Sequence, residues 1–181
     1  MDFNRHSYLK GQHAFLSASK YHWANYDEEK LVASYSRWMA AKRGTDLHEL
    51  AHRCIELGVK VQTPKTIKLY VNDAIGFKME TEKVLYYSDN CFGTVDSISF
   101  RKNCLRIHDL KTGVTPASMQ QLIIYAALFC FDFDIKPIDI DMELRIYQLD
   151  EVLIYNPEPE EIINLMDKII QFDKKIEQMN R

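Results

Sequence analysis

Apolar and polar residues alternate along four stretches of this chain, and each alternation predicts a β-strand. The four predicted strands cover residues 82–87, 91–100, 105–111 and 139–148. In the last of them Ile140, Met142, Leu144 and Ile146 fall on one face, because successive side chains of a strand point to opposite sides of the sheet. The apolar face of such a sheet must be covered by another layer.

Helical patterns occupy both ends of the chain. The first part favours three helices, over residues 19–26, 28–41 and 46–57. Thr45 is the expected cap of the third helix and Gly58 its expected end. Near the C-terminus, apolar residues at helical spacing predict a final helix over residues 159–179.

Two further segments carry helical signals, one ahead of the first predicted strand and one between the third and fourth. Residues 65–76 fit a helical stripe, yet residues 66–71 also alternate like a strand, so both assignments stay open. The second segment begins with Thr115 as an expected cap and Pro116 in the first turn of a helix. That helix would carry Gln121 and Tyr125 on one face, since they are four residues apart.

The order of these elements predicts an α/β fold with a mixed central sheet flanked by helices and an N-terminal helical region. At 181 residues with 46% hydrophobic content, the chain can bury one good core. We therefore expect a single domain over 1–181, with residues 1–60 as the helical region and residues 61–181 as the sheet and its flanking helices.

The second and third predicted strands place two carboxylates opposite each other. If a four-residue turn joins these strands, Phe100 faces Leu105 and Asp96 faces Asp109. Directly opposed like charges destabilise a sheet unless something neutralises them. Hard oxygen ligands suit Mg²⁺ or Mn²⁺, and Lys111, on the face of Asp109, would stabilise charge on a phosphate. Two solvated acids on a surface hairpin are the ordinary alternative. The apolar residues that share a face with the two aspartates argue against it, namely Ile98, Phe100, Leu105 and Ile107.

Three short motifs resemble those of the RecB-type branch of the PD-(D/E)XK nucleases, which includes small stand-alone members from phages and mobile elements. They are Gly93-x-x-Asp96, Asp109-Leu-Lys111-Thr-Gly and Gln121-Leu-x-x-Tyr125, in this order. That branch also carries an upstream helical His after Gly and a small residue, which Gly44-Thr-Asp-Leu-His48 supplies. The resemblance implies a restriction-endonuclease-like core.

The resemblance also implies a set of site residues. The implied metal ligands are the side chains of His48, Asp96 and Asp109 and the backbone carbonyl of Leu110. The implied catalytic residues are Asp96, Asp109, Lys111, Gln121 and Tyr125. Lys111 would assist the nucleophilic water, while Gln121 and Tyr125 would support the active site or touch the nucleic-acid backbone.

The implied reaction is hydrolysis of a DNA phosphodiester by metal-activated water, with Mg²⁺ or Mn²⁺ as the cofactor. We expect an exonuclease that acts in DNA recombination, repair or processing. Glu82, ahead of the first strand, is a candidate ligand for a second cation, and Glu80 would serve as well. The alternative is a nuclease-fold protein that binds nucleic acid without cutting it, or cuts only with a partner.

A rival motif overlaps the expected metal ligand. His48-Glu49-Leu-Ala-His52 matches the H-E-x-x-H pattern of zinc metalloproteases, in which two His bind Zn²⁺ and the Glu is the general base. A third ligand is needed, and no His follows before residue 108. The nearest later acids are Glu56, Asp73 and Glu80. The nuclease hypothesis leaves Glu49 and His52 without roles, and His52 is then expected to be a helix residue with a satisfied hydrogen bond.

Charge is distributed unevenly along the chain, whose formal net charge is -3. Residues 1–115 carry 17 Lys or Arg against 13 Asp or Glu, whereas residues 116–181 carry 6 against 13. The proposed catalytic half is only mildly basic, so tight DNA binding would need metal, oligomerisation or a partner. Candidate phosphate contacts are Lys10, Lys20, Arg37, Lys42 and Arg43.

Several classes of function are disfavoured by what the sequence lacks. It has no Gly-rich phosphate loop, so any motor would be another protein. Candidate partners are a helicase, a recombinase or an annealing protein, with a homo-oligomer as a further option. The four cysteines show no C-x-x-C pairing, which favours reduced thiols, and no iron-sulfur cluster is expected because no Cys follows Cys130. The polar start predicts no signal peptide, and the apolar runs are too short for a membrane span. We expect a cytoplasmic protein, in the host cytoplasm if it is viral.

Overall fold

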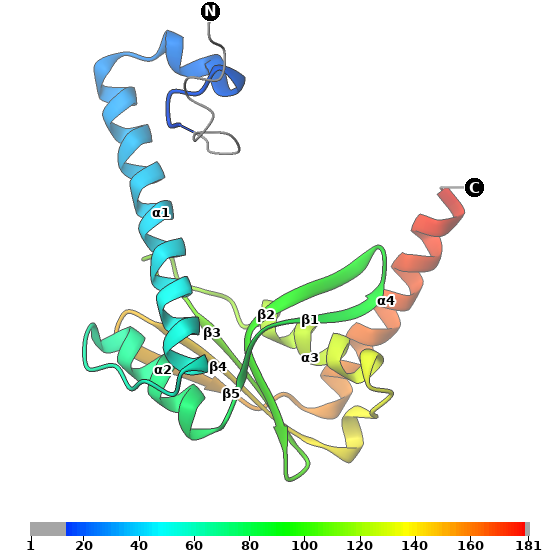
Figure 1. The fold of residues 1–181 in the computed structure, drawn as a ribbon. Helices are drawn as coiled ribbons and strands as arrows, with labels where there is room; N and C mark the ends of the chain where they lie inside the picture. Colours follow the sequence, from blue (N-terminus) through cyan, green and yellow to red (C-terminus); the bar gives the residue numbers. More distant parts are fainter. Residues whose placement is uncertain (1–13, 180–181) are drawn as a thin grey trace, which may run out of the picture. The chain divides into compact units, whose positions relative to one another are not determined.

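The computed structural model describes residues 14–179 and divides the chain into two compact units, Met1–Thr45 and Asp46–Arg181. Figure 1 shows the fold coloured along the chain. The 3-10 helix η2 (Ala18–Asn25) belongs to the first unit, and helix α1 (Glu28–Glu56) begins there. Lys10 and the start of the chain lie outside the described residues. The prediction of a single domain stays a prediction.

Helix α1 is continuous where two helices were predicted. The expected cap at Thr45 is wrong, because its hydroxyl donates back to the carbonyl of Ala41 at 3.3 Å, as a residue inside a helix does. Asp27 caps the true start, since its carboxylate accepts the N–H of Lys30 at 2.8 Å. Gly44 costs the helix about 1 kcal/mol and does not stop it.

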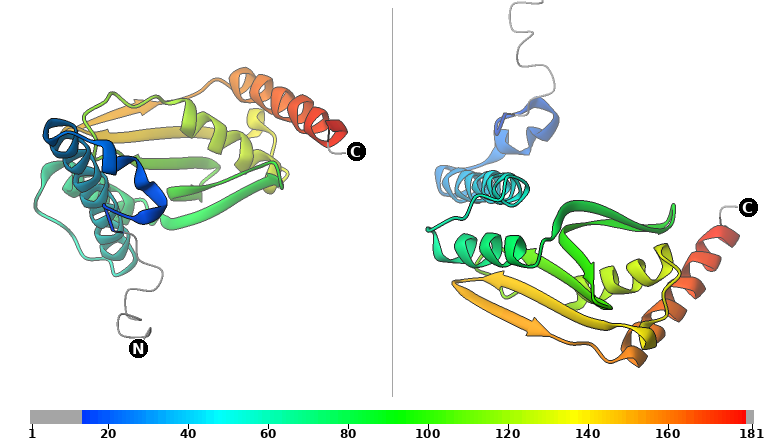
Figure 2. Two further views of the ribbon diagram at one scale, coloured as in Figure 1. Left: turned by 90° about the horizontal axis from the view of Figure 1, so that it is seen from above. Right: turned by 60° about the horizontal axis from the view of Figure 1, so that its bottom comes forward.

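Five strands form one mixed sheet. They are β1 (Glu80–Ser88), β2 (Cys91–Arg101), β3 (Cys104–Leu110), β4 (Asp141–Gln148) and β5 (Glu151–Tyr155). They pair in chain order, parallel between β3 and β4 and antiparallel elsewhere. Figure 2 shows β1 in green at one edge and β5 in orange at the other. This is the predicted α/β architecture, with a mixed sheet, flanking helices and an N-terminal helical region.

The hairpin of β2 and β3 has the predicted register. Phe100 pairs with Leu105, and the ladder continues to Ser97 opposite His108. Its two-residue turn, Lys102 and Asn103, has φ of 51° and 59°, the backbone that matches the right-handed twist of hairpin strands. The site residues on β2 and β3 are therefore fixed by a tight local turn.

Strand β5 was not predicted. It is short, lies at the edge of the sheet and is largely exposed. Because it has no fully buried face, its apolar positions do not alternate with polar ones. The turn before it consists of Leu149 and Asp150, both at positive φ. Leu is rare in that conformation, so this turn carries no residue pattern typical of a hairpin.

Two layers of helices cover the sheet. Helix α2 (Lys65–Gly76) packs with the end of α1 in a cluster that includes Leu110 and Tyr147. Helices α3 (Gln120–Asp132) and α4 (Pro159–Met179) pack in a second cluster with the apolar residues of β2, β3 and β4. The ambiguous segment 65–76 is thus a helix, and the predicted C-terminal helix is confirmed.

Helix α3 begins at Gln120, so the predicted cap at Thr115 and first turn at Pro116 are wrong. The segment ahead of α3 is held instead by the amide of Gln148 in β4. Its Nε2 donates to the carbonyls of Gly113 and Thr115, each at 2.7 Å, and its Oε1 accepts the N–H of Ala117 at 3.1 Å. These bonds satisfy backbone groups that a helix would have paired internally.

None of the helices within residues 14–179 is long and apolar enough to cross a membrane. All four cysteines are free thiols.

Candidate metal centre

Asp109 is the most buried carboxylate of the predicted site. It lies in β3, is 3% exposed, and Lys111 places its ammonium 2.9 Å from Oδ2 and 3.1 Å from Oδ1. Burial raises the pKa of Asp109 to about 6, helped by the nearby Asp96 and opposed by Lys111. Desolvation and the like charge of Asp96 therefore destabilise the charged form of Asp109, and a bound cation would stabilise it.

Asp96 faces Asp109 from β2, but the two residues do not form a regular backbone pair. The ladder ends one step earlier, at Ser97 and His108. Where the next backbone pair would form, the carboxylate of Asp96 accepts the N–H of Leu110, with 2.9 Å between Oδ2 and N. Asp96 thus replaces a backbone acceptor, and the strands part at the level of the two carboxylates.

His48 reaches this site from the C-terminal part of α1, which belongs to the second unit. Its Nδ1 lies 3.5 Å from Oδ2 of Asp96. Burial lowers the pKa of His48, although Asp96 and the backbone of Leu110 oppose the shift. The imidazole is therefore neutral at pH 7, which is the form that binds metals. Of the four predicted metal ligands, His48 and Asp96 lie together and the backbone N–H of Leu110 contacts Asp96. Asp109 precedes Leu110 in β3, pairs with Lys111, and lies outside the group formed by the ligand atoms of His48, His52 and Asp96.

A chain of hydrogen bonds links the remaining predicted catalytic residues. The ammonium of Lys111 donates to Oε1 of Gln121 at 2.9 Å, and Nε2 of Gln121 donates to the hydroxyl of Tyr125 at 3.2 Å. The hydroxyl of Tyr125 donates to the carbonyl of Thr94 at 2.7 Å. The side chains of α3 are thus tied to β2 and to Lys111, which directly follows β3.

Gly93 makes room for this chain of bonds. A Cβ at Gly93 would lie 2.8 Å from Cε1 of Tyr125, closer than carbon atoms can approach without a shift. The Gly93-x-x-Asp96 motif therefore has a packing role beside the site.

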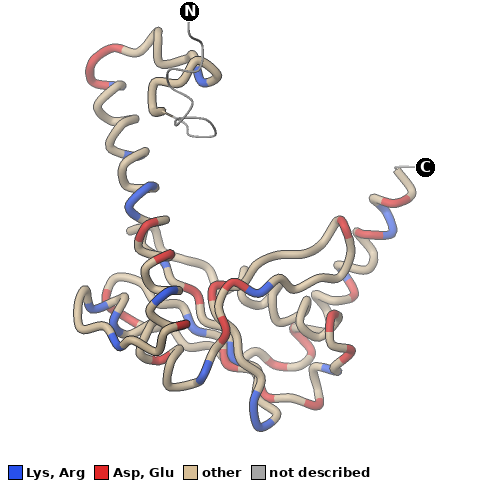
Figure 3. Tube along the Cα trace, in the orientation of Figure 1, with Lys and Arg blue, Asp and Glu red and all other residues tan. Residues whose placement is uncertain are grey.

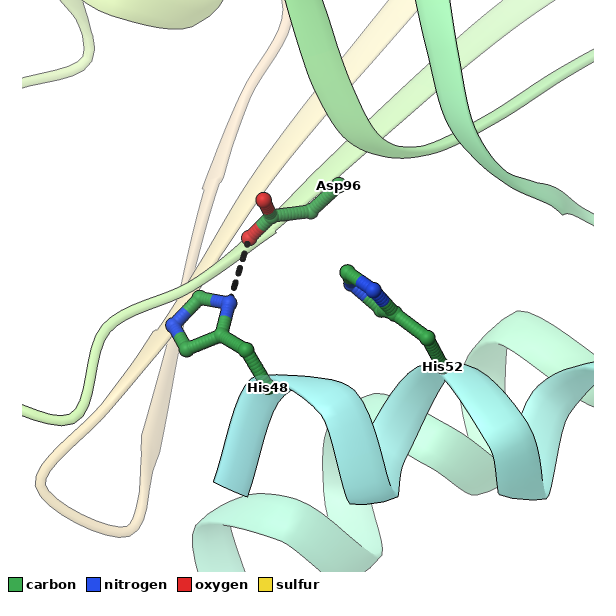
Figure 4. Close-up of side chains that lie close together, drawn as sticks. All are labelled: His48, His52 and Asp96. Carbon is green, nitrogen blue, oxygen red and sulfur yellow. Dashed lines mark ion pairs between the residues drawn. The ribbon is translucent and has the colours of Figure 1, made fainter. Parts of the chain in front are cut away.

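His52 joins the site from the same face of α1, one turn after His48. One ligand atom each of His48, His52 and Asp96 lie within 4.8 Å of one another, and Figure 4 shows both imidazoles extending from the helix toward Asp96. The expectation of a satisfied hydrogen bond at His52 is wrong, since neither ring nitrogen makes one to the described residues.

Glu82 and Glu80, which the sequence could not separate, lie in different surroundings. Oε1 of Glu82 lies 2.9 Å from Nδ1 of His52, outside hydrogen-bond geometry. Glu80 pairs with Lys83 at 3.0 Å and is largely exposed. Of these two glutamates, only Glu82 therefore contacts a histidine of the site, His52.

Glu49, the general base of the rival protease motif, does not face the site. It is exposed and pairs with Arg53 at 2.9 Å. The third zinc ligand that the sequence lacked is nevertheless available, because Asp96 stands beside both histidines.

Tyr70 of α2 is a site neighbour that sequence reasoning missed. Its side chain is fully buried and its hydroxyl has no hydrogen-bond partner among the described residues. Burial raises the pKa of Tyr70, and the charges of Asp96 and Asp109 raise it further. The only signal was its place in the ambiguous segment 65–76, where a helical assignment would have turned it inward.

An open pocket of about 380 Å³ adjoins Lys111. Thr112 and Gly113 line it on one side, and Thr66 and Asp150 on another. Asp150 accepts the hydroxyl of Thr66 at 2.8 Å. This pocket provides open space beside Lys111.

Comparison of the chain with protein-family models, curated proteins and solved structures gave no match. The resemblance to RecB-type nucleases therefore rests on the residues and their spacing.

Proposed function

We propose that this protein is a metal-dependent DNA nuclease of the PD-(D/E)XK type that hydrolyses phosphodiester bonds. One observation carries the proposal, which is the position of the Lys111 ammonium. It lies 2.9 Å from the buried carboxylate of Asp109 and 2.9 Å from the amide oxygen of Gln121. The ammonium is thereby held between the carboxylates and the open pocket, where a phosphate would bind.

The residues present fit a divalent cation of the Mg²⁺ or Mn²⁺ kind. Asp96 and Asp109 provide carboxylates, Leu110 provides a carbonyl, and the neutral His48 provides nitrogen. The raised pKa of Asp109 to about 6 indicates a negative charge with too little local compensation. When bound, such a cation would polarise a phosphate oxygen and lower the pKa of water.

The chain's own groups orient and stabilise the reacting atoms. Lys111 supplies a fixed positive charge for the phosphate, and Gln121 restricts the direction of that ammonium through its amide oxygen. Tyr125 anchors Gln121 to the carbonyl of Thr94. Because these groups are held in place before substrate binds, little reorganisation is needed in the transition state.

DNA binding would depend on the cation more than on surface charge. Basic and acidic positions are interspersed along the trace (Figure 3). A site with two carboxylates repels phosphate until a cation is present. A recombinase, an annealing protein, a helicase or a second copy of the chain would supply further contacts, and the expected setting is DNA recombination, repair or processing.

A zinc peptidase is the second candidate, favoured by the cluster of His48, His52 and Asp96. Its general base would be Glu49, which is exposed and paired with Arg53. It would also leave Lys111 and Gln121 without a role, and we rank it below the nuclease.

The test is cleavage of end-labelled linear and closed-circular DNA, single- and double-stranded, with Mg²⁺, Mn²⁺, Zn²⁺ or EDTA. Cleavage should require Mg²⁺ or Mn²⁺, disappear in Asp109→Asn and persist in Asp141→Asn, a matched change at an exposed acid. Cleavage of closed-circular DNA would show that the protein does not need a free DNA end. Absence of cleavage, with DNA binding retained, would favour a binding protein, and hydrolysis of a peptide substrate with Zn²⁺ would favour the peptidase.

A further inference from the structure

The pocket beside Lys111 has the lining of a site for a small organic ligand. Its apolar walls are formed by Leu47, Pro64, Ile67 and Leu149. Mostly apolar walls with a few polar groups are typical of such sites, and a volume of about 380 Å³ lies at the small end of their range. All of the lining residues belong to the second unit of the chain, so this pocket lies within one compact body.

Hydrogen bonds fix the walls of this pocket before any ligand binds. The hydroxyl and the N–H of Thr66 donate to Oδ1 of Asp150 at 2.8 and 3.0 Å, and the N–H of Asp150 donates to the same hydroxyl at 2.8 Å. These bonds join the first turn of α2 to the turn between β4 and β5. Beside Thr112, the carbonyl of Gly113 accepts a hydrogen bond from Gln148 at 2.7 Å. A ligand therefore meets a preformed pocket and loses little affinity to ordering of the protein.

Two charged side chains line the pocket, and each complements one part of a nucleotide. Lys111 provides an ammonium, which pairs with a phosphate. Asp150 provides an acceptor, because Thr66 occupies Oδ1 while Oδ2 makes no hydrogen bond to the described residues. A carboxylate oxygen accepts hydrogen bonds from the amino group that adenine, cytosine and guanine carry and thymine lacks. The apolar walls are suited to the flat ring of a base.

Only an unpaired base can make these contacts. Within a duplex, the two faces of a base are covered by its stacked neighbours, and its pairing edge is bonded to the opposite strand. Neither the apolar walls nor the carboxylate of Asp150 could then replace those contacts. Removing a base from a duplex costs a few kcal/mol, and the cost is lowest where the base is already single-stranded.

We propose that this pocket binds the base of an unpaired nucleotide whose phosphate contacts Lys111, with a preference for bases that carry an amino group. The substrate is then DNA with unpaired nucleotides, either a single strand or an unpaired end. This inference rests on the proposed function, since the contact between Lys111 and a phosphate is taken from it. Base recognition is the added element, and it is tested separately from cleavage.

The experiment uses the full chain with Mg²⁺ and three probes that contain no phosphodiester bond. These are deoxycytidine 5′-monophosphate, thymidine 5′-monophosphate and the base-free deoxyribose 5-phosphate, and NMR titration gives their dissociation constants. Thr112→Leu narrows the pocket without adding an aromatic ring. Thr115→Leu is the matched control, at an exposed residue of the same connection that does not line the pocket.

A third variant, Asp150→Asn, tests the polar side of the pocket. Asn tolerates the φ of 63° found at this position. It also keeps an oxygen for Thr66 and replaces the other oxygen of Asp150 by a donor. Because it acts through a different wall, this variant keeps the test valid even if Thr112→Leu does not fold.

Wild type and Thr115→Leu should bind the cytosine nucleotide about tenfold more tightly than the base-free sugar phosphate. They should also bind it about fivefold more tightly than the thymine nucleotide. Thr112→Leu should lose most of the first ratio, and Asp150→Asn the second. Equal binding of the three probes by wild type, or equal ratios in Thr112→Leu and Thr115→Leu, would overturn the proposal.

DNA cleavage by the same samples separates this inference from the proposed function. Wild type should cut single-stranded DNA with a higher kcat/KM than blunt duplex DNA, and Thr112→Leu should raise the KM for the single strand more than it changes kcat. Base-dependent binding of the nucleotides without any DNA cleavage would support the pocket and reject the nuclease. Equal cleavage of both DNAs, with equal binding of the three probes, would support the nuclease and reject the pocket.

Discussion

The carboxylate of Asp96 accepts the backbone N–H of Leu110 across 2.9 Å. Asp96 therefore stabilises the sheet in addition to its proposed role as a metal ligand, and substitutions can separate the two roles. Asp96→Asn keeps an oxygen for Leu110 and removes the charge. Asp96→Ala removes both and leaves the Leu110 N–H unpaired, which costs about 1–3 kcal/mol.

We expect both variants to lose Mn²⁺ binding and cleavage, and only Asp96→Ala to unfold at clearly lower urea concentration. Urea unfolding of the metal-free proteins checks this. Equal stability of the two variants would mean that the hydrogen bond contributes little.

Asp109→Asn should stabilise the metal-free protein at neutral pH while it abolishes activity. The folded protein holds the proton of Asp109 up to a pKa of about 6, against an ordinary value of 3.8. Between these values the folded state binds more protons than the unfolded state, so stability falls as pH rises. Ionisation of Asp109 thus costs the fold about 3 kcal/mol above pH 6. The free energy of unfolding of Asp109→Asn relative to wild type should rise from pH 4 to pH 7, and a flat difference would contradict the raised pKa.

His108 should have the opposite pH dependence. Burial lowers its pKa to about 3, with the charges of Arg145 and Arg106 adding to the shift. Between pH 6.5 and that value the unfolded state binds more protons, so stability is lost as pH falls. The loss between pH 6.5 and pH 4 is about 3 kcal/mol.

The variant His108→Gln does not titrate and keeps an amide for Tyr147, whose hydroxyl lies 3.1 Å from Nδ1 of His108. Its stability relative to wild type should rise as the pH is lowered, in urea titrations from pH 7 to pH 4. Asp109 and His108 offset each other in the wild type over this window, so only the differences between variant and wild type reveal them. A parallel pH profile for His108→Gln would disprove the assignment.

Gly93→Ala should disturb Tyr125 more than the sheet. The added Cβ would lie 2.8 Å from Cε1 of Tyr125, so the ring must move and its hydroxyl must leave the carbonyl of Thr94. Overpacking of this kind costs about 1–3 kcal/mol. Combining Gly93→Ala with Tyr125→Leu should recover much of the stability, whereas Tyr125→Phe should not, because Phe retains Cε1. A double-mutant cycle in urea measures this coupling, and additive effects would reject it.

Local patterns predicted most of the fold. The β2–β3 register was recovered because a tight turn fixes it, as Phe100 opposite Leu105 confirms. The α4 helix was recovered because its apolar spacing is regular. The errors at Thr45 and Thr115 share a cause, because each residue resembles a helix cap but other contacts decide its conformation. Thr45 lies inside α1 and bonds to Ala41. The segment that follows Thr115 is held by Gln148 of β4.

The site was predicted in part for the same reason. Asp96, Asp109 and Lys111 lie on one hairpin and its continuation, so their meeting depends only on strand geometry. His52 and Tyr70 come from two other elements, α1 and α2, and nothing local in the sequence indicates that their side chains lie near Asp96. The close approach of Gly93 to Tyr125 likewise depends on how α3 packs on β2.

Gln148 holds the connection between Lys111 and helix α3 through backbone atoms alone, at Gly113, Thr115 and Ala117. These bonds involve no side chain of the connection, so an exposed side chain such as Thr112, which lines the pocket beside Lys111, can change without breaking them. The exposed side of this segment can therefore vary, during evolution or by engineering, while its attachment to β4 is kept.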